Sequence, residues 1–331
     1  MGNPTHEIPR RREARNHSFG RTVVAVGTPD PGATRHSPGA FYRWYQRYLA
    51  RGAEALGDGQ SAPRRVWNKL PAKVAAAVVE LALKEPELSP PELATAFVDQ
   101  RQYFVSEASV YRLLKARGLI TSPAFILLKA ADHFAHPTTS VNELWQTDFT
   151  YLRVVGWGWF YLSTVLDDFS RYILAWKLCT TMTAADVTET LRLALTAAGL
   201  NQATVRQRPR LLSDNGPSYL SAQLGAWLDE HGMTHTRGQP YHPMTQGKIE
   251  RHHRSLKNRI LLEHYYLPGQ LEARLAEFVD FYNTRRYHES LGNLTPADIY
   301  FGRGRTILAR RQTIKHQTIE LRRRLHQEAV A

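Results

Sequence analysis

Residues 144–167 read LWQTDFTYLRVVGWGWFYLSTVLD, and this stretch decides the fold. Two runs rich in β-branched and aromatic side chains, 144–155 and 159–167, flank Gly156-Trp157-Gly158. Such runs on either side of a short glycine-containing segment predict two antiparallel strands joined by a tight turn. A third strand is predicted over 171–178, so the three strands form an antiparallel meander.

Short strands alternate with helices after this meander. Apolar spacing predicts helices over 184–198 and 218–231 and strands over 210–212 and 233–236, followed by a long helix that begins near Gln246. The order βββαβαβα predicts an α/β fold in which helices cover a mixed five-stranded sheet. Two further helices are predicted downstream, over 271–286 and 306–327.

Three shorter helices are predicted upstream of the sheet. The first covers 71–83, and Ser89 is the expected N-cap of the second. Ser106 caps the third, which ends at Gly118, a residue suited to the left-handed conformation that closes many helices. The region 70–120 is therefore expected to form a small all-α module.

The third of these helices has one apolar face and one basic face. Its inner face carries Val110, Leu113 and Leu114. Arg112 and Lys115 lie outside, where they are candidates for DNA contacts. Three short helices whose last is basic on its outer side are typical of a helix-turn-helix DNA-binding module. The alternative is an ordinary helical bundle with a solvated charged face.

Composition favours a polyanionic partner. The chain of 331 residues has a formal net charge of +13 and a pI of about 9.9. Such an excess of cations is typical of proteins that bind DNA or RNA. The competing idea is a basic protein at a membrane surface. However, the sequence has neither a run of about 20 apolar residues nor an apolar N-terminal signal region. We therefore expect a cytoplasmic protein, associated with the nucleoid when bound to DNA, and no membrane partner.

Cysteine usage excludes two further classes. Cys179 is the only cysteine, so a disulfide within the chain is impossible and a zinc knuckle that needs two cysteines is excluded. A single cysteine is compatible with a reducing cytosol.

Three acids stand in three different local settings. Asp148 lies within a predicted strand in QTDFTYL, Asp214 ends a strand in LLSDNGPSY, and Glu250 lies on the long helix in QGKIERHHR. If folding brings these carboxylates together, a cation must hold them. Oxygen ligands suit Mg²⁺ or Mn²⁺, and two such ions can clamp the attacking and leaving oxygens of a phosphate ester. The three acids therefore predict metal-dependent phosphoryl transfer on nucleic acid.

Each acid also has a simpler interpretation. A buried strand carboxylate such as Asp148 needs either a cation or hydrogen bonds. Asp214 belongs to an Asp-Asn-Gly sequence, which is common turn chemistry without function. Glu250 could form a surface pair with a cation four residues on, worth about 0.2–0.5 kcal/mol. The neighbouring Asp167 and Asp168 are interpreted as structural, one as a strand-end cap and the other as a turn residue.

The helix that carries Glu250 has a basic stripe beside it. At 100° per residue, Arg254 and Lys257 share the face of Glu250. They are expected to hold DNA phosphates near the metal. The stripe predicted to pack inward consists of Ile249, Leu256 and Ile260. Further expected DNA contacts are Lys248, Gln246 and His242.

Five blocks of the chain, in order, resemble those of DDE-type bacterial insertion-sequence transposases with a retroviral-integrase-like core. The blocks lie within residues 140–302, and the helix after Ser106 resembles the upstream DNA-binding region of that family. The five blocks are LWQTDFTYL, LDDFSRYILAW, LLSDNGPSY, YHPMTQGKIERHHRSLKNRI and FVDFYNTRRYHESLGNLTPADIY.

The resemblance implies a ribonuclease H-like fold with Asp148, Asp214 and Glu250 as catalytic metal ligands for two Mg²⁺ or Mn²⁺ ions. It also implies cleavage of double-stranded DNA at the ends of an insertion sequence and strand transfer to target DNA. The expected partners are further copies of the chain on DNA and a protein from an upstream reading frame. Two alternatives stay open: a non-catalytic DNA-binding remnant and a ribonuclease H-like nuclease. A glycosidase that uses a carboxylate pair fits the +13 charge poorly.

The sequence thus predicts five regions. The aromatic residues of the segment 41–49 recur at helical spacing, which favours packing against a neighbouring helix. The regions are a disordered basic N-terminus (1–40), a helical, helix-turn-helix-like DNA-binding region (41–120), a linker (121–140), an integrase-like catalytic core (141–303) and a basic C-terminal helix (304–331).

Overall fold

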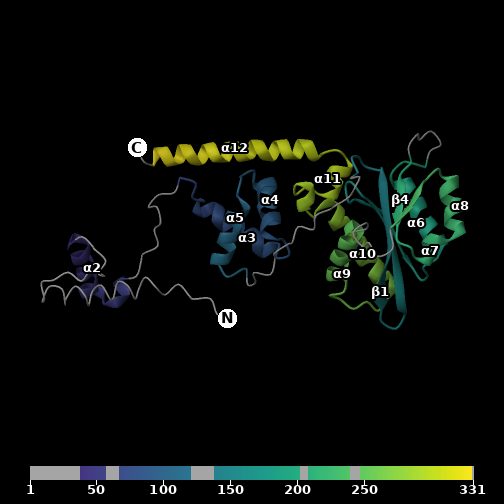
Figure 1. Cartoon of the computed structure of the whole chain (residues 1–331), viewed down its shortest axis with the longest axis horizontal. Coiled ribbons are helices and arrows are strands. Elements are labelled where there is room, and N and C mark those ends of the chain that lie inside the picture. The colour runs from purple at the N-terminus through teal and green to yellow at the C-terminus, as the bar shows by residue number, and fades with distance from the viewer. Residues whose placement is uncertain (1–37, 57–66, 121–137, 202–207, 239–246, 330–331) are drawn as a thin grey trace, which may run out of the picture. The chain divides into compact units, whose positions relative to one another are not determined.

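The computed structural model describes residues 38–56, 67–120, 138–201, 208–238 and 247–329 (Figure 1). The chain divides into two compact units, 1–66 and 67–331. In the first unit, α2 (Pro38–Arg51) contains the aromatic segment predicted to be helical, and the short 3₁₀ helix η1 (Ala53–Leu56) packs beside it. Most of the predicted disordered N-terminus and of the predicted linker lies outside the described residues.

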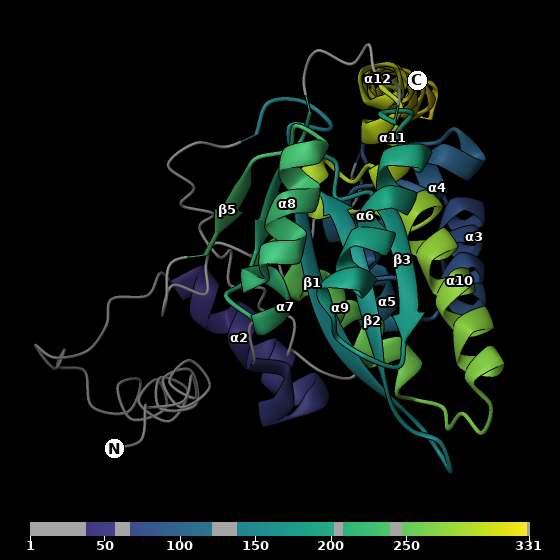
Figure 2. The same ribbon diagram turned by 90° about the vertical axis from the view of Figure 1, so that its right-hand side faces the viewer.

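The second unit contains the predicted sheet. Its strand order is β3-β2-β1-β4-β5 (Figure 2). The pairs β1–β2 and β2–β3 are antiparallel, and the pairs β1–β4 and β4–β5 are parallel. The prediction of a mixed five-stranded sheet is therefore confirmed. The strands are β1 (Leu144–Val154), β2 (Gly158–Asp167), β3 (Ile173–Cys179), β4 (Arg210–Ser213) and β5 (His235–Arg237).

Glycines close the β1–β2 hairpin. Gly156 and Gly158 have φ angles of +84° and +96°, a conformation that residues with a Cβ rarely adopt. The turn predicted between the two strands therefore forms where the sequence places it. At the far end of the meander, Cys179 is buried at the end of β3.

Two apolar cores form on opposite faces of the sheet, because side chains alternate along a strand. On one face Trp145 of β1 packs with Leu191 and Leu224. On the other face Leu152 and Val154 pack with a second group of helices. The first face is covered by α6 (Ala184–Ala197), α7 (Pro217–Leu220) and α8 (Ala222–Glu230), and the second by α9 (Gly247–Ile260) and α10 (Pro268–Thr284).

One predicted helix is two helices in the structure. The prediction of a continuous helix over 218–231 is wrong, because Ser221 has extended backbone angles (φ −64°, ψ 134°). Its hydroxyl accepts a hydrogen bond from the amide of Gln223 at 3.2 Å and so caps α8. Serine competes with the helix for such local hydrogen bonds, which explains the break.

The helical module forms as predicted. It consists of α3 (Ala72–Lys84), α4 (Pro90–Arg101) and α5 (Glu107–Ala116), which bury a common core that includes Val78, Phe97 and Val110. The hydroxyl of Ser106 accepts a hydrogen bond from the amide of Ser109 at 3.3 Å, which confirms the predicted N-cap.

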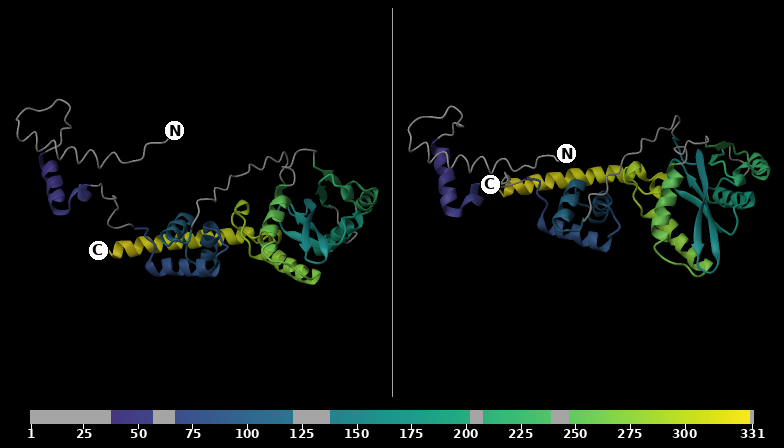
Figure 3. Two further views of the ribbon diagram at one scale, coloured as in Figure 1. Left: turned by 90° about the horizontal axis from the view of Figure 1, so that it is seen from below. Right: turned by 60° about the horizontal axis from the view of Figure 1, so that its bottom comes forward.

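The chain ends in a long helix. After η3 (Glu289–Leu291) and α11 (Pro296–Tyr300), α12 (Gly304–Glu328) runs alongside the helical module (Figure 3). The prediction of a helix over 306–327 is confirmed. Within the described residues, no helix is long and apolar enough to cross a membrane.

Candidate active site

Strand pairing brings Asp148 and Asp214 together. β1 and β4 are parallel, with Gln146 opposite Leu212, and two residues further along each strand the chain reaches Asp148 and Asp214. Burial raises the pKa of the Asp214 carboxyl above its usual value, and the charge of Asp148 raises it further. A hydrogen bond from the amide of Gly216 to Asp214 Oδ1, at 2.9 Å, acts in the opposite direction. Two of the three predicted acids are therefore close enough to repel each other.

Asp148 faces α9 and not α6. It has the same parity on β1 as Leu152 and Val154, whose core includes Leu256 of α9. The carboxylate is 22% exposed, and its Oδ1 accepts a hydrogen bond from its neighbour's amide at 2.8 Å. Its Oδ2 lies 3.4 Å from Nδ1 of His253. This contact could not be predicted from local patterns, because His253 is separated from Asp148 by 105 positions.

Gln146 fixes the start of α9 on β1. Its side chain is fully buried, and its Oε1 accepts a hydrogen bond from the amide of Ile249 at 3.1 Å. Amides in the first turn of a helix lack partners within the helix, so this contact satisfies one of them and sets the position of the helix. Glu250 is the next residue, in the first turn and exposed. The elements that carry the three acids thus meet at the central strand of the sheet, because β4 pairs with β1 and α9 begins beside Gln146 of β1.

The acids do not form a closed metal cage. Among the described residues, no three His, Cys, Asp or Glu side chains are grouped so that they could hold a metal ion. Asp148 and Asp214 form the close pair, and Glu250 stands on the neighbouring helix.

Asp167 and Asp168 serve the fold, as predicted. Asp167 is buried and accepts hydrogen bonds from the Asn142 amide at 2.7 Å and from the amide and hydroxyl of Ser170 at 2.8 and 2.6 Å. Asp168 is 2% exposed, and Lys248 Nζ lies 2.7 Å from its Oδ2. Further hydrogen bonds to Asp168 come from Thr138 Oγ1 at 2.6 Å and Gln146 Nε2 at 2.7 Å.

The predicted face of α9 is present. Ile249, Leu256 and Ile260 are buried, whereas Arg254 is exposed and Lys257 is half-buried. The apolar stripe therefore packs inward as the sequence predicts. The contact of Arg254 and Lys257 with DNA stays a prediction.

The other predicted DNA contacts divide into three cases. Arg112 and Lys115 are exposed on α5. His242 and Gln246 lie outside the described residues. The amine of Lys248 donates hydrogen bonds to the carboxylate and backbone oxygens of Asp168 at 2.7 and 3.0 Å, so the structure gives it an internal partner. A DNA contact by any of these residues stays a prediction.

Tyr219 is a neighbour of the acids that the sequence did not single out. It is 4% exposed on α7, and its ring contacts Phe149. Burial raises the pKa of its hydroxyl well above the usual value, and the charges of Asp148 and Asp214 raise it further. The hydroxyl therefore remains protonated beside the two carboxylates. The sequence shows that Tyr219 lies five residues after Asp214, but it does not predict that the side chain lies near the two acids.

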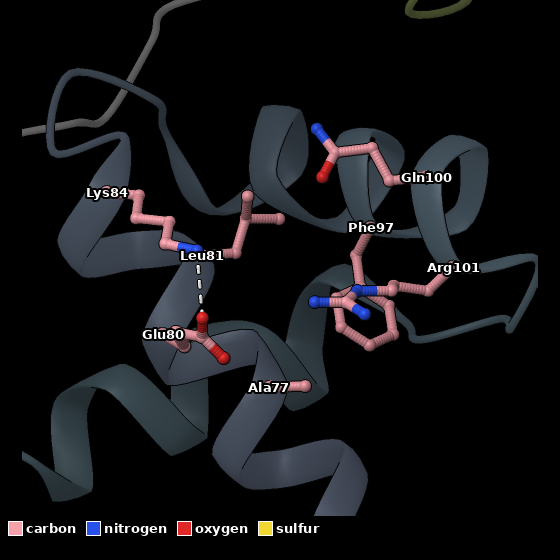
Figure 4. A pocket seen from close by; sticks show the side chains of 7 residues that line it. All are labelled: Ala77, Glu80, Leu81, Lys84, Phe97, Gln100 and Arg101. Atoms are coloured by element: carbon pink, nitrogen blue, oxygen red, sulfur yellow. Dashed lines mark hydrogen bonds and ion pairs between the residues drawn. The ribbon is translucent and has the colours of Figure 1, made fainter.

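The one cavity shown in close view is unrelated to these acids. It lies between α3 and α4, has a volume of about 50 Å³ and is lined by the Glu80–Lys84 ion pair among others (Figure 4). It is too small for a nucleotide, and none of the three acids lines it.

Comparison with known proteins assigns the domains. Residues 138–243 and 231–296 match two family models of the integrase core domain, and residues 40–114 match that of a homeodomain-like domain. The chain therefore contains an integrase core preceded by a homeodomain-like region. The prediction of a ribonuclease H-like, integrase-type α/β core behind a helix-turn-helix module is confirmed.

Two curated relatives of the chain are transposases. The transposase InsF for insertion sequence IS3A of Escherichia coli (strain K12) is 30% identical over 160 residues, which cover 47% of this chain and 52% of the relative. The transposase for insertion sequence element IS629 of Shigella sonnei is 30% identical over 168 residues, with 47% and 51% covered. The chain thus spans about half the length of the curated relatives it matches. The predicted resemblance to insertion-sequence transposases is confirmed.

One solved structure is similar to part of the chain. The HTLV-2 integrase catalytic core domain in complex with magnesium is 20% identical, and the match covers 49% of this chain and 97% of that one with a TM-score of 0.39.

Proposed function

We propose that this protein is the transposase of an insertion sequence, which cuts DNA at the element ends and joins the freed 3′ hydroxyl to target DNA. The observation that carries the proposal is the parallel pairing of β1 with β4, which brings Asp148 next to the end of β4, where Asp214 follows, with the helix of Glu250 beginning beside Gln146. This is a polynucleotidyl transferase reaction.

The residues of the site fit a divalent metal. Asp148 and Asp214 repel each other, and a cation between them would remove that cost. Their donors are carboxylate oxygens, which Mg²⁺ and Mn²⁺ prefer. We propose that Asp148, Asp214 and Glu250 hold two such ions. When bound, the ions would supply Lewis acidity for the attack and departure of oxygen at a phosphodiester.

The chain's own residues would hold the DNA. Arg254 and Lys257 lie on the face of α9 that carries Glu250, so their cations are placed to bind phosphates near the cut. Arg112 and Lys115 project from α5, the last helix of the module, and would contact the element end. We propose that copies of the chain act together on the two ends, with an upstream-frame protein as a further partner.

The experiment replaces each acid by its amide. Asp148→Asn, Asp214→Asn and Glu250→Gln should each reduce end cleavage and strand transfer in Mg²⁺ or Mn²⁺ by at least about 100-fold. Binding of end DNA should be retained, because the amides keep the shape and remove the ligand charge. Asp229→Asn is the matched control, since Asp229 is an exposed acid of the same core on α8. Strand transfer that survives one of the three substitutions would remove that residue from the site.

The same assay separates the alternatives. A ribonuclease H-like nuclease would cleave RNA–DNA hybrids and would not join a 3′ hydroxyl end to target DNA. A non-catalytic remnant would bind element ends tightly and show no metal-dependent chemistry, even when an upstream partner is supplied.

A further inference from the structure

The C-terminal helix α12 contacts the helical module through two arginines that the sequence does not distinguish from its other cations. Arg311 and Arg322 are eleven residues apart, which is close to three helical turns, so both project from one face of α12. Between them, the Thr318 hydroxyl accepts a hydrogen bond from the amide of Phe104 at 3.0 Å.

Arg322 is buried against the module. It is 7% exposed, and its guanidinium donates to three acceptors. The acceptors are Tyr103 Oη at 2.9 Å, Asn68 Oδ1 at 2.8 Å and the Phe104 carbonyl at 2.7 Å. Burial of a guanidinium is costly unless its donors are satisfied. Because three acceptors in fixed positions must be met at once, this contact selects one orientation of the module on α12.

Arg311 ties the module to the end of the catalytic core. It forms a bidentate pair with Asp99 of α4, at 2.9 and 2.7 Å, and donates to the Asn293 carbonyl at 2.8 Å. The hydroxyl of Tyr287 also donates to Asp99, at 3.0 Å. Asp99 belongs to the module, whereas Tyr287 and Asn293 follow α10 of the core. The planar guanidinium of an arginine donates its hydrogen bonds in fixed directions, whereas the ammonium of a surface lysine does not.

A second direct contact joins the two parts. Arg259, near the end of α9, lies 2.9 Å from the carboxylate of Glu87 between α3 and α4. Since α9 also carries Glu250, the helix of the candidate active site touches the module that would recognise DNA.

We infer that α12 fixes the orientation of α5 relative to the Asp148–Asp214 site, and so sets the distance between the recognised sequence and the cut phosphodiester. The inference rests on the proposed function. Base pairs are 3.4 Å apart along a strand, so a displacement of the module by a few ångströms would move the cut by one base pair. Arg311 and Arg322 act as positioning residues, because they hold the module and touch none of the three acids.

The first test maps the position of cleavage. Arg322→Gln should bind end DNA but spread the cuts over neighbouring phosphodiesters, whereas the wild-type protein cuts at one position. Arg324→Gln is the matched control: it makes the same change of charge two residues along α12, at an exposed position. A purely structural role would lower the yield and leave the position of the cut unchanged. Cleavage by Arg322→Gln at the wild-type position alone would overturn the inference.

The second test needs no activity. Spin labels on Arg117→Cys, at the end of α5, and Glu230→Cys, on α8, report the distance between module and core in the full chain without DNA. The distance distribution should be narrow in the otherwise wild-type and Arg324→Gln proteins and should broaden in Arg322→Gln. Equal widths in all three would overturn the inference, even if the protein proves to be an active transposase. An inactive protein whose distribution still broadens would instead refute the proposed function and leave the role of α12 standing.

A reciprocal exchange covers the case in which Arg322→Gln fails to fold. Arg311→Asp and Asp99→Arg should each broaden the distance distribution by placing like charges together. The double variant restores opposite charges and should narrow the distribution again. If the double variant is as broad as either single variant, the Arg311–Asp99 pair does not position the module.

Discussion

Two pairs of aspartates on one sheet differ in how many donors surround them. Asp167 and Asp168 are buried and receive hydrogen bonds from amides, hydroxyls and the amine of Lys248. Asp148 and Asp214 each accept one backbone hydrogen bond that the structure records, and they lie near each other. A carboxylate has about four lone-pair positions. The first pair uses them for the fold, whereas the second leaves oxygens available to a ligand.

The largest expected effect follows from removing the charge of Asp168. Asp168→Asn removes the carboxylate charge that lies 2.7 Å from the amine of Lys248, whose side chain is 12% exposed. Loss of one partner from a buried pair typically costs about 3–5 kcal/mol of unfolding free energy. Asp148→Asn should cost less than about 1 kcal/mol, because it removes no ion pair with Lys or Arg. Urea denaturation of the two variants measures both values, and equal losses would break the comparison.

A metal titration should also distinguish the pair Asp148 and Asp214 from the pair Asp167 and Asp168. Addition of Mg²⁺ to the DNA-free protein should raise its Tm, because an ion that binds only the folded state stabilises it by about 2.7 kcal/mol at 100 times Kd. Excess EDTA should reverse the shift. Asp214→Asn should abolish the response, and Asp168→Asn should keep it from a lower starting Tm. A response that survives in Asp214→Asn would place the ion elsewhere.

The smallest expected effect is on the dependence of stability on pH. Burial, followed by the charge of Asp148, raises the pKa of folded Asp214 above its unfolded value. Its stabilising contribution is therefore complete below the unfolded pKa and is lost as the pH rises through the folded pKa. Asp214→Asn should melt above the wild type near neutral pH and converge with it in acid. The effect is small because Asp214 is only partly desolvated: the residue as a whole is exposed, so solvent screens its charge. If the Tm–pH curves of the wild type and of Asp214→Asn run parallel, the raised pKa of Asp214 is contradicted.

Local patterns were enough to predict most of the fold. The glycine-flanked hairpin, the capped helices of the module and the apolar stripe of α9 all depend on residues close in sequence. The three acids were singled out from their local settings in the same way, and their role as metal ligands stays a prediction. Ser221 shows the limit, because a single hydroxyl that bonds to the nearby backbone divided a helix that the apolar spacing predicted as one.

Contacts across long separations could not be predicted. Lys248 and Asp168 are 80 positions apart, so the residues next to Lys248 in the sequence do not reveal this partner. The sequence neighbours of Arg311 and Arg322 are similar to those of the exposed cations of α12, so the sequence does not distinguish the two arginines. Their burial depends on acceptors from residues 68–104, which no periodicity within the helix reveals.

The alternation of side chains along β1 has a consequence for how this protein tolerates change. One set of alternate residues builds the core against α6, and the other carries both Asp148 and the core against α9. A deletion or insertion of one residue ahead of Asp148 would exchange the two sets. Sequence drift in this strand is therefore confined to substitutions. Changes in length should be tolerated better at the hairpin turn, Gly156 to Gly158, because the turn lies beyond the residues of β1 whose direction matters to the acids.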